Sequence, residues 1–112
     1  MRLSECERRG LEHALQGVPF PVFLFGSRLD DARRGGDIDL AVLATSLAPA
    51  ERLALSLRMA VRFRSICDEK IDVQVFDTES LSVEERAFLA ITRREPLALP
   101  SPANTSTRTD AG

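Results

Sequence analysis

Apolar residues recur at helical spacing between Leu3 and Leu15, and the S-x-x-E pattern of Ser4 and Glu7 stands at the start of this stretch. In such a capping box, each of the two side chains accepts a hydrogen bond from the backbone N–H of the other residue at the start of a helix. The pattern therefore predicts a first amphipathic helix, which ends at Gly17.

Three short stretches have the pattern of strands. Residues 22–25 are wholly apolar, as in a strand that is buried on both faces. Residues 37–44 place Ile38, Leu40 and Val42 on one face and the aspartates on the other. Residues 70–76 alternate between apolar and polar, so that Ile71 points to one face and Asp72 to the other. The alternation predicts two strands that each carry polar residues on one face.

Residues 49–67 predict a long helix with two apolar stripes. One stripe contains Leu53, Leu57, Ala60 and Val61, and the other contains Leu55, Met59, Phe63 and Ile66. One stripe can cover a sheet, whereas the other needs a further helix, a partner protein or a second copy of the chain. The Met59 and Phe63 stripe fits either a core or an interface.

A last helix is predicted from the capping box of Ser82 and Glu85 to about residue 94.

This order of elements predicts an α+β domain over residues 1–98. We expect a small mixed three-stranded sheet with helices mainly on one face, which leaves the opposite face free to carry chemistry. Pro96 and Pro100 are expected to end regular structure. Residues 99–112 are small and polar, and predict a disordered tail.

Composition narrows the function classes. A chain of 112 residues suits one domain. Its 15 basic and 17 acidic residues give a net charge of −2, which offers no global attraction to nucleic acid or to anionic membranes. No apolar run approaches the roughly 20 residues that span a bilayer, and the first residues are too charged for a signal peptide.

Cys6 and Cys67 lie far apart without metal-site spacing. We therefore expect two reduced thiols in a cytoplasmic protein.

The candidate chemistry begins with two aspartates. Asp37 and Asp39 are two residues apart on a predicted strand and so share a face. Two carboxylates side by side repel each other unless a hard cation such as Mg²⁺ lies between them. If the third strand is a neighbour, Asp72 joins them. Alone, the first pair also fits a solvated sheet edge, and Asp72 fits a carboxylate on a strand surface.

Gly26 and Ser27 follow the first predicted strand. A glycine turn at this point lets backbone N–H groups approach an anion closely, and the serine hydroxyl can donate as well. The arginines that follow, Arg28, Arg33 and Arg34, fit either contact with a triphosphate or pairing with neighbouring aspartates. The sequence thus predicts a phosphate site beside the carboxylates.

In combination, "FLFGSR", "GGDIDLAVL" and "KIDVQVF" resemble the minimal nucleotidyltransferases (MNT) of the DNA polymerase β superfamily, over roughly residues 20 to 95. The resemblance implies the polymerase β-like fold, with an α-β-α-β-α-β core. It also implies two Mg²⁺ ions held by the catalytic residues Asp37, Asp39 and Asp72, and ATP bound at Gly26 and Ser27, with Arg28 beside them.

Stand-alone MNT proteins of this size are commonly encoded with a HEPN protein, a helical RNase toxin. The resemblance therefore implies an antitoxin that transfers AMP from ATP to a tyrosine hydroxyl of its toxin partner. The absence of Tyr from this chain fits modification of another chain. Two alternatives stay open. One is a binding module that neutralises a toxin without catalysis, and the other is a small-molecule adenylyltransferase, although such relatives usually carry an additional helical domain.

Overall fold

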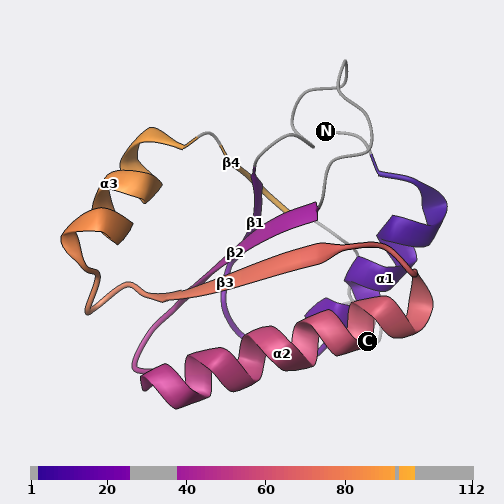
Figure 1. Ribbon diagram of the computed structural model, residues 1–112, viewed down its shortest axis with the longest axis horizontal. Coiled ribbons are helices and arrows are strands. Elements are labelled where there is room, and N and C mark those ends of the chain that lie inside the picture. Colours follow the sequence, from indigo (N-terminus) through magenta and orange to yellow (C-terminus); the bar gives the residue numbers. More distant parts are fainter. Residues whose placement is uncertain (1–2, 26–37, 93, 98–112) are drawn as a thin grey trace, which may run out of the picture.

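The computed structural model describes residues 3–25, 38–92 and 94–97. In this part of the chain, the helices are α1 (Glu5–Leu15), α2 (Pro49–Ile66) and α3 (Val83–Ile91), and the strands are β1 (Val22–Phe25), β2 (Ile38–Ala44), β3 (Ile71–Asp77) and β4 (Arg94–Pro96) (Figure 1). The predicted α+β class is confirmed. The predicted tail, residues 99–112, lies outside the described residues.

The strands form one mixed sheet in the order β3-β2-β1-β4. β2 and β3 are parallel, whereas β1 is antiparallel to both β2 and β4. The prediction of three strands was wrong because β4 contains Pro96, which was expected to end regular structure. Proline is tolerated there because β4 is an edge strand, whose outer side needs no N–H donor. Pro96 pairs with Phe23, and the N–H of Leu97 donates to the carbonyl of Val22 at 2.9 Å.

α2 connects β2 to β3, because a parallel pair requires a crossover. Of its two apolar stripes, the one that contains Met59 and Phe63 packs against the sheet and α1. Both of these side chains are fully buried, whereas Ile66 at the end of the stripe is 41% exposed. These positions are therefore core and not interface. The largest fully buried side chains of this face are Phe63, Leu11, Leu24, Ile38, Leu40, Met59 and Val42.

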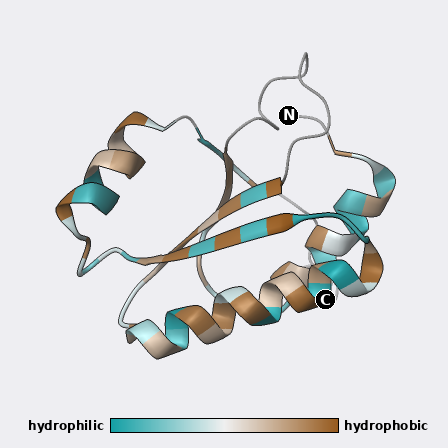
Figure 2. Cartoon of the chain, viewed as in Figure 1, coloured by the Kyte–Doolittle hydropathy of each residue, from teal (hydrophilic) through white to brown (hydrophobic). Residues whose placement is uncertain are grey.

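The other stripe of α2 is open. Leu53, Leu57 and Val61 are 60%, 58% and 68% exposed and follow one another at intervals of one helical turn. Figure 2 shows hydrophobic residues along the whole length of the helix. Within the described ranges, no helix is both long and apolar enough to cross a membrane.

Both predicted capping boxes form. The N–H of Glu7 donates to the Ser4 hydroxyl at 3.1 Å, and the N–H of Ser4 donates to the Glu7 carboxylate at 2.8 Å. Ser82 and Glu85 make the same two hydrogen bonds at the start of α3. Local sequence therefore sets where these two helices begin.

α1 and α2 approach closely at Gly10, a position that weakens an isolated helix. A Cβ atom at Gly10 would lie 2.7 Å from Cδ1 of Phe63 and 3.2 Å from the Phe63 carbonyl oxygen. Only glycine fits here without a shift of the aromatic ring or of the helix. The glycine that lowers helix propensity is therefore the residue that lets α1 lie against α2.

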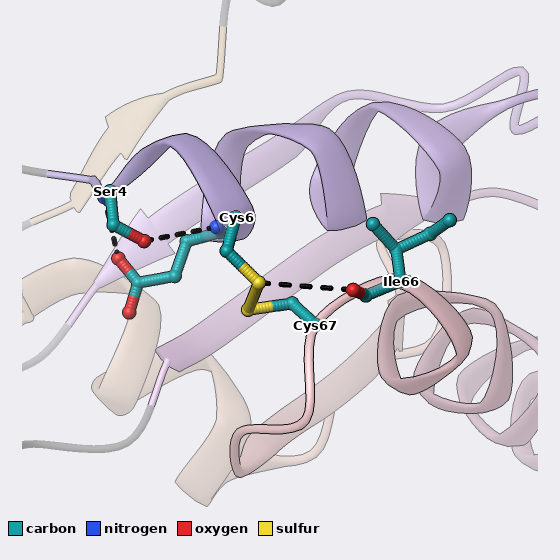
Figure 3. The surroundings of a disulfide bond; sticks show 5 residues. Ser4, Cys6, Ile66 and Cys67 are labelled. Carbon is teal, nitrogen blue, oxygen red and sulfur yellow. Dashed lines mark hydrogen bonds between the residues drawn. A yellow bond between two sulfur atoms is a disulfide. The ribbon is translucent and has the colours of Figure 1, made fainter.

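Cys6 and Cys67 form a disulfide, so the expectation of two reduced thiols was wrong (Figure 3). Their Cα atoms are 5.4 Å apart although 61 residues separate them in the chain. Cys6 lies one turn before Gly10, and Cys67 lies one turn after Phe63. The helix contact thus brings the cysteines together, which their spacing along the chain does not reveal.

α3 packs on the other face of the sheet, around a second apolar cluster. Phe88 of α3 contacts Phe25 edge-on, with the ring centroids 5.3 Å apart, and stacks on Phe76 at 6.0 Å. Phe25, Ala41 and Phe76 are buried beneath it. The face expected to be free is therefore partly covered, because α3 crosses to the side opposite α1 and α2.

We expect Gly10→Ala to lower the free energy of unfolding by about 1–3 kcal/mol, the usual cost of an overpacked core, although alanine favours an exposed helix by about 1 kcal/mol. The measurement is urea unfolding followed by circular dichroism. The loss should shrink in a Phe63→Leu background, which removes the ring that the new methyl group meets. Equal losses in both backgrounds would contradict the proposed contact.

We expect reduction of the Cys6–Cys67 disulfide to lower the free energy of unfolding by about 2–4 kcal/mol, because the bond restricts a long segment of the unfolded chain. Urea unfolding with and without a dithiol reductant measures the change. Cys6→Ser is the matched control, since it should unfold at the same urea concentration under both conditions. If the wild-type chain unfolds at the same urea concentration with and without the reductant, the expectation is wrong.

Candidate active site

Asp39 of β2 and Asp72 of β3 are direct partners in the parallel ladder. Neighbouring strands lie about 5 Å apart, and residues opposite each other point to the same face. The neighbouring strands on which the predicted carboxylate site depends are therefore present. Two aspartates separated by 33 positions in the sequence lie opposite each other on these strands.

The two aspartates lie on the face of the sheet opposite α1 and α2. Ile38 and Leu40, which flank Asp39, are fully buried in the core beneath those helices. Asp39 itself is half-buried, and Asp72 is exposed. The alternation of each strand thus separates the chemistry from the main core, as the sequence predicts.

Asp39 and Asp72 carry like charges at paired positions of neighbouring strands. Like charges directly opposite each other on adjacent strands destabilise a sheet. A hard divalent ion offsets this repulsion, and carboxylate oxygens are the ligands that Mg²⁺ takes from proteins. Asp39 and Asp72 therefore provide a donor set that fits Mg²⁺.

The remaining predicted site residues lie outside the described part of the chain. These are Gly26, Ser27, Arg28, Arg33, Arg34 and Asp37. Phe25 precedes these residues and is the partner of Asp39 in the β1–β2 ladder, and Ile38 follows them. Phe25 is the last residue of β1 and Ile38 the first of β2, so both lie at the strand ends next to Asp39 and Asp72.

Among the described residues, no three His, Cys, Asp or Glu side chains form a group that could hold a metal ion. The described carboxylates supply a pair, and the expected third ligand, Asp37, lies outside the described ranges. The structure therefore brings together two of the predicted ligands and leaves the third untested.

Arg94 belongs to the same row of the sheet and was not predicted. It is the partner of Phe25 in the β1–β4 ladder, so Asp72, Asp39, Phe25 and Arg94 form one row across the four strands. Its guanidinium carbon lies 5.1 Å from the centroid of the Phe23 ring, and the guanidinium donates to the carbonyl of Leu89 at 2.6 Å. Arg94 thus ties the end of α3 to the sheet edge and adds a positive charge to the face of the carboxylates.

The comparisons with known proteins assign no family. No model of a protein family matches the chain, and no curated protein matches it either. The function must therefore be argued from the residues and their arrangement.

We expect Asp72→Asn to leave the stability of the metal-free protein unchanged or to raise it by up to about 1 kcal/mol, because the substitution removes a like-charge pair. In the wild type, Mg²⁺ at roughly ten times its Kd should add about 1.4 kcal/mol, or several degrees in Tm. The variant should lose most of this gain. Thermal unfolding with and without Mg²⁺ provides the test.

Asp68→Asn is the matched control for this measurement. Asp68 is exposed, lies 3.7 Å from the guanidinium of Arg64, and precedes β3, so it is not a member of the strand pair that joins Asp39 to Asp72. It should keep the full response to Mg²⁺. The same response in Asp72→Asn and the wild type would show that the pair does not bind the ion.

Proposed function

We propose that this protein is a Mg²⁺-dependent nucleotidyltransferase that transfers AMP from ATP to a hydroxyl group. The observation that carries the proposal is the placement of Asp39 opposite Asp72 on parallel strands. The sequence resemblance to the minimal nucleotidyltransferases adds the phosphate site at Gly26, Ser27 and Arg28, the third carboxylate Asp37, and the polymerase β-like fold. The mixed sheet is compatible with an α+β fold.

Asp39 and Asp72 would hold Mg²⁺ together with Asp37. When bound, the ion supplies Lewis acidity toward phosphate oxygens and neutralises their negative charge. The protein's own contribution is to position the groups and to accept a proton. Asp72 suits the second role because its carboxylate is exposed and open to an acceptor hydroxyl.

The proposed reaction is a substitution at the α-phosphorus of ATP. The hydroxyl oxygen of the acceptor forms a bond to this phosphorus, the bond to the bridging oxygen of the β-phosphate breaks, and pyrophosphate leaves. The hydroxyl proton passes to the carboxylate of Asp72. No residue of this chain has to be modified for the reaction to proceed.

The acceptor that we propose is a tyrosine of a HEPN-type RNase toxin, in the cytoplasm, with this protein as its antitoxin. The resemblance suggests this partner, and the absence of Tyr here agrees with an acceptor on another chain. The exposed row of Leu53, Leu57 and Val61 on α2 offers an apolar surface for docking.

The same exposed row favours a second candidate function. An antitoxin can neutralise its toxin by covering the active site, without transferring a nucleotide. In that case the surface of α2 carries the function, and the Asp39–Asp72 pair is dispensable. The two functions therefore depend on different residues and can be separated by mutation.

We expect Asp39→Asn to abolish AMP transfer, because it removes a carboxylate at the centre of the site while the strand pairing stays intact. The assay incubates the purified chain with labelled ATP, Mg²⁺ and the product of the neighbouring gene, and locates AMP by mass spectrometry. Asp68→Asn is the matched control and should transfer at the wild-type rate. Full transfer by Asp39→Asn would exclude the proposed site.

Neutralisation of the partner, measured in parallel, distinguishes the two functions. Leu57→Gln keeps helix propensity but makes the exposed row polar. If Asp39→Asn still neutralises the partner while Leu57→Gln does not, the protein acts by binding. If Asp39→Asn loses both transfer and neutralisation while it still binds the partner, the protein acts by catalysis.

A further inference from the structure

We propose that Cys6 and Cys67 are a reversible redox pair, opened by a low-molecular-weight thiol such as glutathione, and that their disulfide fixes the connection that leads into β3 and Asp72. The proposal concerns thiol chemistry and the fold, so it stands apart from the proposed transfer reaction. Figure 3 shows the bond between the first turn of α1 and the end of α2.

The two sulfurs differ in access. Cys6 lies on an exposed turn, whereas Cys67 is 1% exposed and belongs to the core cluster. A thiolate from solution therefore reaches the sulfur of Cys6 and not that of Cys67. This asymmetry sets the order of the exchange steps and predicts where a mixed disulfide forms.

The exchange balances as two thiol–disulfide steps. A glutathione thiolate forms a bond to the Cys6 sulfur, the bond between the protein sulfurs breaks, and Cys67 leaves as a thiolate that takes up a proton. A second glutathione thiolate attacks the sulfur of the bound glutathione and releases Cys6 as a thiolate, which takes up a proton from water. The products are two protein thiols and glutathione disulfide, and the reverse reaction restores the bond.

The cysteines stay close together after reduction because the helix contact does not depend on sulfur. Phe63 is fully buried and lies against Gly10. Gly10 is one helical turn from Cys6, and Phe63 is one turn from Cys67. The Cys6 sulfur is also 3.8 Å from the Ile66 carbonyl oxygen, to which a free thiol can donate a hydrogen bond. The reduced chain thus keeps the geometry from which the bond re-forms.

The disulfide acts on the candidate site through a short connection. Cys67 follows the last residue of α2, and β3 begins at Ile71. The carbonyl of Lys70 accepts from the N–H of Ile38 at 3.3 Å, next to the pair of Asp39 and Asp72. With Cys67 tied to α1, both ends of residues 68–70 are fixed. Reduction removes the covalent link at Cys67 and leaves this end held by packing alone.

The first experiment places the full chain in glutathione buffers of varied thiol-to-disulfide ratio, traps free thiols with maleimide and maps them by mass spectrometry. We expect complete interconversion of dithiol and disulfide at constant circular dichroism, with mixed disulfide at Cys6. A bond that opens only in urea, or a chain that never oxidises, would overturn the proposal. So would a mixed disulfide on Cys67 in place of Cys6.

The second experiment measures amide hydrogen exchange of the oxidised chain, the reduced chain and Cys6→Ser. We expect exchange over residues 68–73 to be at least about threefold faster without the bond, while α3 changes little, because the opening is local. Cys6→Ser should behave like the reduced chain. A uniform increase throughout the chain, or no increase, would contradict the link to Asp72.

The proposed transfer reaction offers a third, separate readout. The wild-type rate should fall on reduction, whereas the rate of Cys6→Ser should be the same with and without reductant. If the transfer rate is the same in the oxidised and reduced states of both proteins, the result contradicts only the link between the disulfide and Asp72. Absence of transfer in every state counts against the proposed function and leaves the first two experiments unaffected.

Discussion

The parallel pairing of β2 with β3 is the constraint on which the rest of this structure depends. Parallel strands cannot be joined by a tight turn, so the chain must cross over the sheet between them, and α2 makes this crossover. The crossover buries Met59 and Phe63 against the sheet and α1 and leaves the stripe of Leu53, Leu57 and Val61 exposed. The same pairing sets Asp39 beside Asp72. The main core and the candidate site thus have one geometric origin.

α1 joins this arrangement through an approach that only glycine permits. Gly10 lies against Phe63, and the first turn of α1 then lies against the end of α2. The disulfide forms where these two ends meet (Figure 3). A substitution at Gly10 would therefore disturb the helix packing and the cysteine pair together. The route from α1 to the connection before β3 is short and consists of packed or covalently joined residues.

The two faces of the sheet have different roles. One face is a continuous apolar core beneath α1 and α2, and the other carries the carboxylates beside a smaller aromatic cluster under α3. Phe25 belongs to the aromatic cluster and is also the neighbour of Asp39. The candidate site therefore lies next to rigid packing, which limits the movement of its strands. Such support is what a site needs if it is to hold phosphate groups in position.

The amino-acid sequence by itself determined the class of the fold, the extent of β1 and the starts of α1 and α3, because these features follow from local patterns. The capping boxes and the alternation of β3 act within a few residues and need no distant partner. The sequence also indicated that Asp39 and Asp72 belong to the polar faces of their strands. The resemblance to a nucleotidyltransferase site assigned both aspartates to one site, whereas the sequence pattern does not show that their strands pair.

Only the tertiary structure decided which distant segments meet. The pairing of Asp39 with Asp72 depends on the strand order, and the disulfide depends on the approach of α1 to α2, which spacing along the chain does not encode. β4 was missed because a three-residue strand with a proline has no periodicity of its own and forms only by pairing with β1. The sequence also did not determine which stripe of α2 is buried. The sheet and α1 cover the side that contains Met59 and Phe63. Local patterns show which face of an element is apolar, but the packing of the whole chain selects what covers it.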